Sequence, residues 1–85
     1  MVQYHRVNYS RRFARPITLA DGTRLVTLKD AADLLTGKRL AHITKWAALE
    51  HAIKLVLEAG DRGGRHRLKA AADQIEIVLR VRGLL

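Results

Sequence analysis

The chain has 85 residues, of which 48% are hydrophobic and 28% charged, and its sixteen Lys and Arg outnumber eight Asp and Glu to give a net charge of +8. This length allows one domain on a single small core. Because there is no cysteine, disulfides and thiolate metal sites are excluded, in keeping with a reducing cytoplasm. No apolar run approaches the roughly 20 residues that cross a bilayer, and no signal-peptide core is present. We therefore expect a cytoplasmic protein without a membrane partner.

The positive charge is concentrated in two short segments. Residues 1–16 contain four arginines and no acid, and residues 60–69 contain Arg62, Arg65, Arg67 and Lys69 against Asp61 alone. Such a distribution is the electrostatic signature of a protein that binds polyanions.

The N-terminal residues 1–15 are basic and polar, with isolated apolar residues between. They predict a mobile basic arm or a short edge strand. Pro16 forces an extended conformation on Arg15 and marks the start of a single domain over 16–85.

A β-hairpin is predicted over residues 17–27. Ile17 and Leu19 alternate before the turn, Leu25 follows it, and Asp21-Gly22 between them favours the positive φ angles of a primed two-residue turn.

A short helix is expected to begin at Thr27 or Leu28 and to end before Gly37. Thr27 can cap the amide of Asp30, whose negative charge in the first turn suits the helix dipole. Its apolar residues recur at helical spacing and are Leu28, Ala31, Ala32 and Leu35.

A longer helix is predicted over residues 40–59, ending at Gly60. Its apolar stripe includes Ile43, Leu49 and Val56, with Trp46 as a core residue. The segment 61–66 should be a loop that reverses the chain at Gly63-Gly64.

The last helix is predicted over residues 67–82. Alternation of Ile75, Ile77, Leu79 and Val81 also fits a strand, although Ala70-Ala71-Ala72 and ion pairs at i,i+4 favour a helix. So large an apolar surface needs cover on two sides, which predicts a homodimer through this helix and the Gly83–Leu85 end. The fold class is then α+β, mostly helical: an N-terminal hairpin followed by one short and two longer helices.

The stretch FARPITLADGTRLVTLKDAADLLT (13–36) resembles a group of uncharacterised short alphaproteobacterial proteins with the pattern F-x-R-P-I-T-L-A-D-G-x-x-L-x-T-L-x-D-A. In that group a second helix carries W-x-x-A-[IL]-E, matched with a small shift by 46–50. The resemblance implies the hairpin-plus-helices fold and a bacterial cytosolic source, and it brings no activity. Lys38-Arg39 and the arginines of 61–67 are more basic than the pattern.

A weaker likeness concerns LVTLKDAADLL (25–35), which is similar to the opening of excisionase-like helix-turn-helix domains. It implies a turn over 36–39 and a recognition helix opening over 40–46. Against it, that turn is a residue too long and no wing follows at the usual place.

No catalytic or metal-binding pattern emerges. The histidines His5, His42, His51 and His66 lack ligand spacing, and Asp30 and Asp33 are first-turn dipole partners. We expect no cofactor and no enzymatic activity.

Two functions remain open. The first is a nucleic-acid-associated protein that contacts phosphates of DNA or RNA, and the second is a protein-interaction module, an adaptor or inhibitor, that docks its basic face on an acidic partner. The candidate nucleic-acid-binding residues are Arg11, Arg12, Arg15, Lys38, Arg39, Arg62, Arg65 and Arg67.

Overall fold

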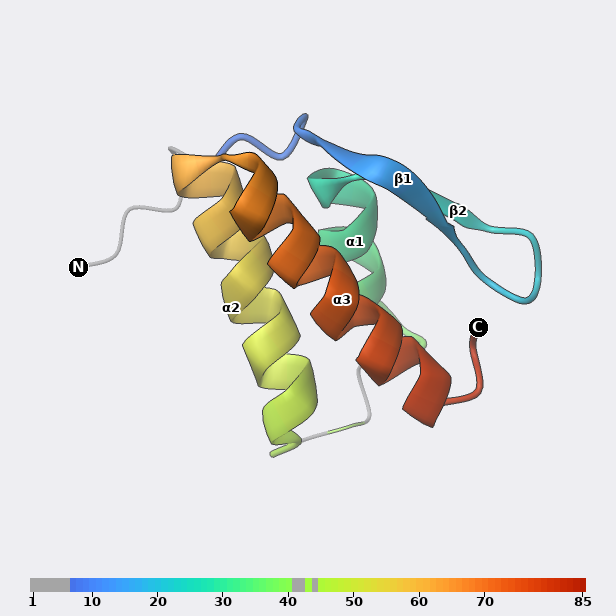
Figure 1. Ribbon diagram of the computed structural model, residues 1–85. Coiled ribbons are helices and arrows are strands. Elements are labelled where there is room, and N and C mark those ends of the chain that lie inside the picture. The colour runs from blue at the N-terminus through green and yellow to red at the C-terminus, as the bar shows by residue number, and fades with distance from the viewer. Residues whose placement is uncertain (1–6, 41–42, 44) are drawn as a thin grey trace.

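The computed structural model describes residues 7–40, 43 and 45–85. Its elements are β1 (Arg12–Thr18), β2 (Arg24–Thr27), α1 (Leu28–Leu35), α2 (Ala47–Arg62) and α3 (Arg65–Val81). Helices α2 and α3 lie antiparallel, α1 packs on α2, and the hairpin contacts α1 and α3 (Figure 1). The predicted fold class, a hairpin followed by one short and two longer helices, is confirmed.

The hairpin pairs Ile17 with Leu25 and Thr18 with Arg24 in antiparallel register. Strand β1 begins at Arg12, five residues before the predicted start, and pairing is irregular between Arg12 and Ile17, where Pro16 has no N–H to donate.

The hairpin turn is not the predicted primed turn. Gly22 donates its N–H to the Leu19 carbonyl oxygen at 3.0 Å, and Leu19 donates to the Thr23 oxygen at 2.7 Å. Of the loop residues only Gly22 has a positive φ, +91°. This is a three-residue loop with a glycine bulge, in which one left-handed residue is enough.

Residues 7–15, predicted as part of a basic N-terminal arm before a domain at 16–85, contribute side chains to the buried interior. Val7 and Phe13 are buried, and Phe13 belongs to the core. The N–H groups of Leu28 and Lys29 donate to the oxygens of Arg11 and Tyr9 at 3.0 and 2.9 Å. Residues 7–15 are therefore part of the folded unit because they satisfy amides that the start of α1 leaves free. Residues 1–6 lie outside the described residues.

The start of α1 follows the prediction. The Thr27 hydroxyl accepts from the Asp30 N–H at 3.3 Å, and an Asp30 carboxylate oxygen accepts from the N–H groups of Val26 and Thr27 at 2.9 and 3.1 Å. This reciprocal capping box holds the pKa of Asp30 below its usual range, chiefly through the Val26 N–H and then the Thr27 N–H.

Helix α2 begins seven residues later than predicted. Leu40 is buried, and its oxygen accepts from the Ile43 N–H at 3.0 Å. Lys45 has φ +55° and Trp46 is extended, so the helix starts only at Ala47. Ile43 and Trp46 still pack against the core, Trp46 half-buried, from irregular backbone. A helix-like apolar spacing therefore arose without a helix at the described residues of that stretch, 40, 43, 45 and 46. Part of that stretch, residues 41–42 and 44, is not described.

Helix α2 also runs past Gly60 to Arg62, and α3 begins at Arg65, so the predicted loop 61–66 shrinks to Gly63 and Gly64. Both have positive φ, +72° and +91°, which confirms them as the chain reversal. Residues 75–81 are helical, so the strand alternative is wrong.

The C-terminal end is bound to its own chain. Leu84 donates to Leu79 and Gly83 to Arg80, the two bonds that complete a Schellman motif, and the Leu84 oxygen accepts from the Ala20 N–H at 2.8 Å. Leu84 packs on the core. Residues 83–84, predicted as part of a dimer surface, thus already fasten α3 to the hairpin loop.

Replacing Asp30 with Asn tests the capping box. We expect the variant to lose about 1 kcal/mol of unfolding free energy at neutral pH because charged acceptors bind backbone amides more strongly than neutral ones. The native pKa of Asp30 lies below its ordinary value of 3.8, so this contribution is present above that value and is lost as pH falls through it towards the native pKa. In urea titrations, the unfolding free energies of the wild type and of Asp30→Asn should differ at neutral pH and converge at acidic pH. A difference in unfolding free energy that does not change with pH would contradict this role of Asp30.

The control is Asp33→Asn, which loses only a surface ion pair with Lys29 and should leave the unfolding free energy nearly unchanged.

Gly60→Ala tests the contact between the N-terminal segment and α2. In an exposed helix this change stabilises by about 1 kcal/mol, but a Cβ at this buried position would overlap Val7 Cγ1. We expect a loss of about 1–3 kcal/mol in thermal or urea unfolding. Adding Val7→Ala should make the double variant more stable than Gly60→Ala alone, whereas additive losses would contradict the overlap.

Candidate nucleic-acid interface

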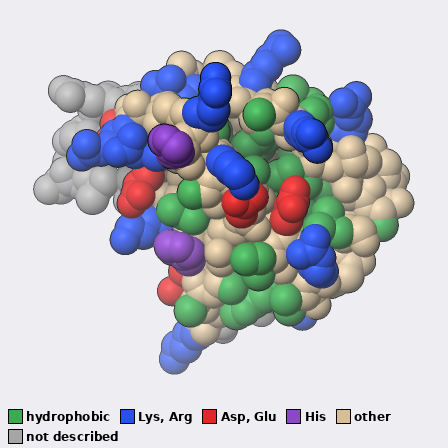
Figure 2. Space-filling model, in the orientation of Figure 1, with side chains coloured by type: hydrophobic (Ala, Val, Ile, Leu, Met, Phe, Trp, Pro, Cys, Tyr) green, Lys and Arg blue, Asp and Glu red, His purple; other side chains and the backbone are tan. Residues whose placement is uncertain are grey.

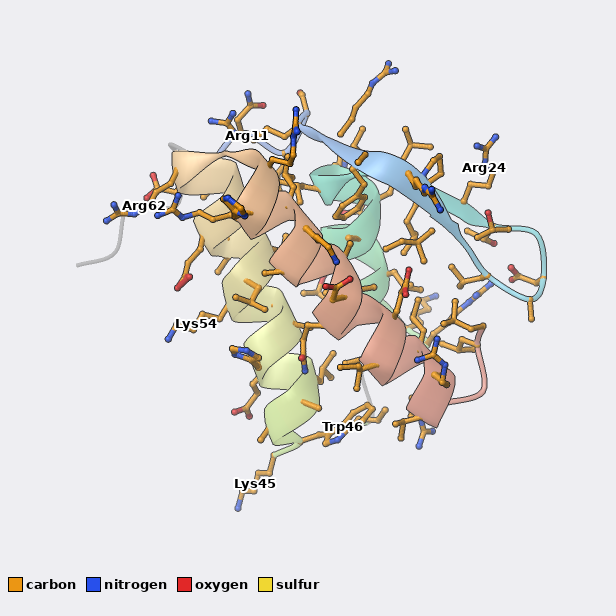
Figure 3. All side chains as sticks on the ribbon, viewed as in Figure 1. Arg11, Arg24, Lys45, Trp46, Lys54 and Arg62 are labelled. Atoms are coloured by element: carbon orange, nitrogen blue, oxygen red, sulfur yellow. The ribbon has the colours of Figure 1, made fainter. Side chains whose placement is uncertain are left out.

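The two-residue turn between α2 and α3 brings three of the predicted arginines to one end of the molecule. Arg62 is the last residue of α2, while Arg65 and Arg67 lie in the first turn of α3. All three side chains are exposed. Arg62 extends from this end of the molecule, where Arg11 also lies (Figure 3). Lys and Arg side chains cover this upper part of the molecular surface (Figure 2).

These three arginines are available for a ligand. Within the part of the chain that the structure describes, three ion pairs are formed, Lys29–Asp33, Arg39–Asp21 and Lys69–Asp73, and none includes Arg62, Arg65 or Arg67. Lys69, by contrast, is held by Asp73 at 3.0 Å.

The backbone adds to the positive potential. The amides of Arg65, His66 and Arg67 precede the first bond of α3, from Leu68 N–H to the Gly64 oxygen at 3.1 Å. The N-cap residue, Gly64, has no side chain to bind them, and the first turn of α3 contains no acid. Free amides at a helix start attract anions, so amides and guanidinium groups act in the same direction here.

Arg11 has a structural role at the end of α2. Its Nε donates to the Gly60 oxygen at 3.1 Å, and its guanidinium lies against Gly63, where a Cβ would collide with it. The same Gly60 oxygen accepts from the Asn8 N–H at 2.9 Å. Half-buried Arg11 therefore caps the C-terminal end of α2, where a cation is favourable, and it supports the turn that carries the other arginines.

Lys38 and Arg39 do not join this cluster. They follow α1 and line a shallow depression with Arg24 and Thr23 of the hairpin. The hairpin loop lies far from the α2–α3 turn (Figure 1). Arg39 donates to the Asp21 carboxylate at 2.6 Å. The Thr23 N–H above all, then the Thr23 side chain and Arg39, lower the pKa of Asp21 to about 2. Arg39 thus ties the hairpin loop to the turn after α1.

Arg12 and Arg15 are exposed residues of β1. Arg12 directly follows Arg11 and opens β1, where it pairs with Thr27 of β2. The structure adds Arg24, an exposed cation of β2 opposite Thr18 that the sequence analysis did not select. The hairpin pattern could have identified it, since strand register decides which basic residues share a surface.

The histidines and aspartates considered for metal binding or catalysis form no such site among the residues described. No group of three metal-ligating side chains occurs among the residues described. His51 and His66 are exposed helix residues, whereas His5 and His42 lie outside the described residues. Asp30 belongs to the capping box and Asp33 pairs with Lys29. No described helix combines the length and apolarity that a membrane span requires.

An apolar groove of about 420 Å³ lies between α1 and α2. Tyr9, Leu35, Ile53 and Leu57 contribute to its lining, and Lys29 and Asp33 are its charged members. Its chemistry suits an apolar side chain rather than a phosphate.

Comparison of this chain with known protein families, curated proteins and solved structures yields no match. Function therefore has to be argued from the geometry of the chain itself.

The division between supporting and available arginines is testable. Arg11→Met should lower the unfolding free energy by about 1–2 kcal/mol because it removes a charged hydrogen bond at a helix end. Arg62→Met and Arg65→Met, matched in size and charge loss, should stay within about 0.5 kcal/mol of the wild type. Urea unfolding measures all three, and equal effects for Arg11 and Arg62 would contradict the assignment.

Proposed function

We propose that this is a cytoplasmic nucleic-acid-binding protein whose main contact is the α2–α3 turn. One observation carries the proposal: Arg62, Arg65 and Arg67, without ion-pair partners in the described structure, flank the turn at which the uncapped amides open α3. Guanidinium groups bind phosphate oxygens bidentately, and backbone amides bind them at helix starts. Arg12 supplies a fourth phosphate contact, while Arg15, Lys38 and Arg39 are peripheral.

Contacts of this kind contribute to affinity for nucleic acid but do not distinguish one base sequence from another. Phosphate contacts fix the position of a protein on nucleic acid, whereas specificity needs side chains at base edges. The cluster consists of arginines on a turn and a helix start, so the proposed activity is general binding to the nucleic-acid backbone.

The salt dependence of binding tests this proposal. If four phosphates are contacted, log affinity for labelled duplex DNA should fall with log salt at a slope of about −3.6 per protomer. Replacing Arg62, Arg65 and Arg67 together with Gln should reduce this slope to about −0.9 and abolish binding at physiological salt. Fluorescence anisotropy provides both quantities.

The matched control is Arg24, Lys38 and Lys54→Gln, which removes the same charge from exposed positions elsewhere. We expect it to retain most of the slope and affinity. Equal losses in the two triple variants would show attraction by net charge alone and would overturn the proposed site.

A second function, binding of a protein partner, is favoured by the apolar groove between α1 and α2. Here the arginine cluster would attract an acidic protein and the groove would hold one of its apolar side chains. If this alternative holds, the protein should not bind duplex DNA at physiological salt. Its complex with the protein partner should be weakened by Ile53→Glu, a change in the groove and remote from the arginines.

A further inference from the structure

The C-terminal half of α3 exposes apolar surface. Among the residues described, the exposed large hydrophobic side chains are Ile77, Val81 and Leu85, with exposed fractions of 46%, 66% and 39%. Ile77 and Val81 are four apart and share a helix face, opposite the buried Ile75 and Leu79. Hydrophobic side chains gather on the lower part of the surface in Figure 2, where Trp46 approaches the same end of α3 in Figure 3.

The charges on this face have a directional pattern. With 3.6 residues per turn, the positions nearest to Ile77 on the outer face are 70, 73, 74, 80 and 81. Asp73 and Arg80 lie on the same edge of this face, one before Ile77 and one after it, and both are exposed. The Asp73 carboxylate accepts from Lys69 at 3.0 Å, and its second oxygen has no partner within the described chain.

We infer that a second copy of the chain covers this face, with the two α3 helices antiparallel about a two-fold axis at Ile77. In that register Ile77 meets its own counterpart and Arg80 lies opposite the partner's Asp73, a pairing that symmetry repeats. A parallel pair has its two-fold axis along the helices and places each of these residues and its counterpart on opposite edges of the seam, so it brings no Asp73 opposite an Arg80. The charge pattern therefore selects one orientation of one partner.

This dimer gives the proposed function a specific ligand, and this step rests on that proposed function. Arg65 lies twelve residues before Ile77, or about 18 Å along the helix, so an antiparallel pair separates its two α2–α3 turns by about 36 Å. The two-fold axis is perpendicular to α3, so both turns can face the same side. One turn of duplex DNA measures about 34–36 Å. The ligand is therefore duplex DNA, contacted at two phosphate sites one helical turn apart.

The dimer is tested first without DNA, by light scattering after size exclusion at micromolar protein. We expect a dimer for the wild type and a folded monomer, by circular dichroism, for Ile77→Glu. Arg80→Asp should weaken the dimer and Asp73→Arg with Arg80→Asp should restore it. Arg82→Asp, the same charge change away from the seam, should leave it intact. A monomeric wild type, or a double variant no better than Arg80→Asp, would overturn the dimer.

The spacing is tested with duplexes of about one and about two helical turns. The wild type should bind the longer duplex more tightly, with about twice the salt slope of Ile77→Glu, which should bind the two duplexes alike. A dimer without preference for the longer duplex would overturn the spacing while leaving the phosphate site standing. A dimer that binds neither duplex would instead refute the proposed function, and with it the ligand inferred from the spacing.

Discussion

A short N-terminal segment, Val7–Arg11, joins the beginning of α1 to the end of α2, and the rest of the structure depends on that junction. Its carbonyl oxygens accept from Leu28 and Lys29, while Asn8 and Arg11 both donate to the Gly60 oxygen. Helix ends leave polar groups that must find partners, and here the ends of two helices find them in one stretch of chain. The α2–α3 turn is thereby held in place, together with the arginines around it.

The basic residues serve two purposes, which charge counting cannot separate. Arg11 and Arg39 are bound to the Gly60 oxygen and to Asp21, so they hold the hairpin and the N-terminal segment on the helices. Arg62, Arg65 and Arg67 project from a turn that others support. A hydrogen-bonded turn beneath exposed cationic side chains suits phosphate binding because it orients the backbone amides while the long guanidinium side chains can adjust to the phosphate.

Much of this fold could be predicted from local signals. Thr27 with Asp30, and Gly63 with Gly64, mark a helix start and a chain reversal through their own backbone chemistry, and both were placed correctly. The start of α2 could not be found this way, since Ile43 and Trp46 pack on the core at helical spacing from irregular backbone. Gly60 was predicted to end the helix, but it lies inside α2. A glycine is needed there because Val7, 53 residues away in the sequence, packs against it and leaves no room for a Cβ atom.

The candidate site was likewise predictable only where it depends on residues that are close in sequence. Arg62, Arg65 and Arg67 are close in sequence, so their clustering followed from a correctly predicted turn. The remoteness of Lys38 and Arg39, and the capping role of Arg11, arise from tertiary contacts. The most direct test of the central claim is an NMR titration of the amide signals with duplex DNA. The largest shifts should fall on residues 62–68. Shifts confined to the hairpin loop, to Lys38-Arg39 or to the α1–α2 groove would show that the DNA binds elsewhere.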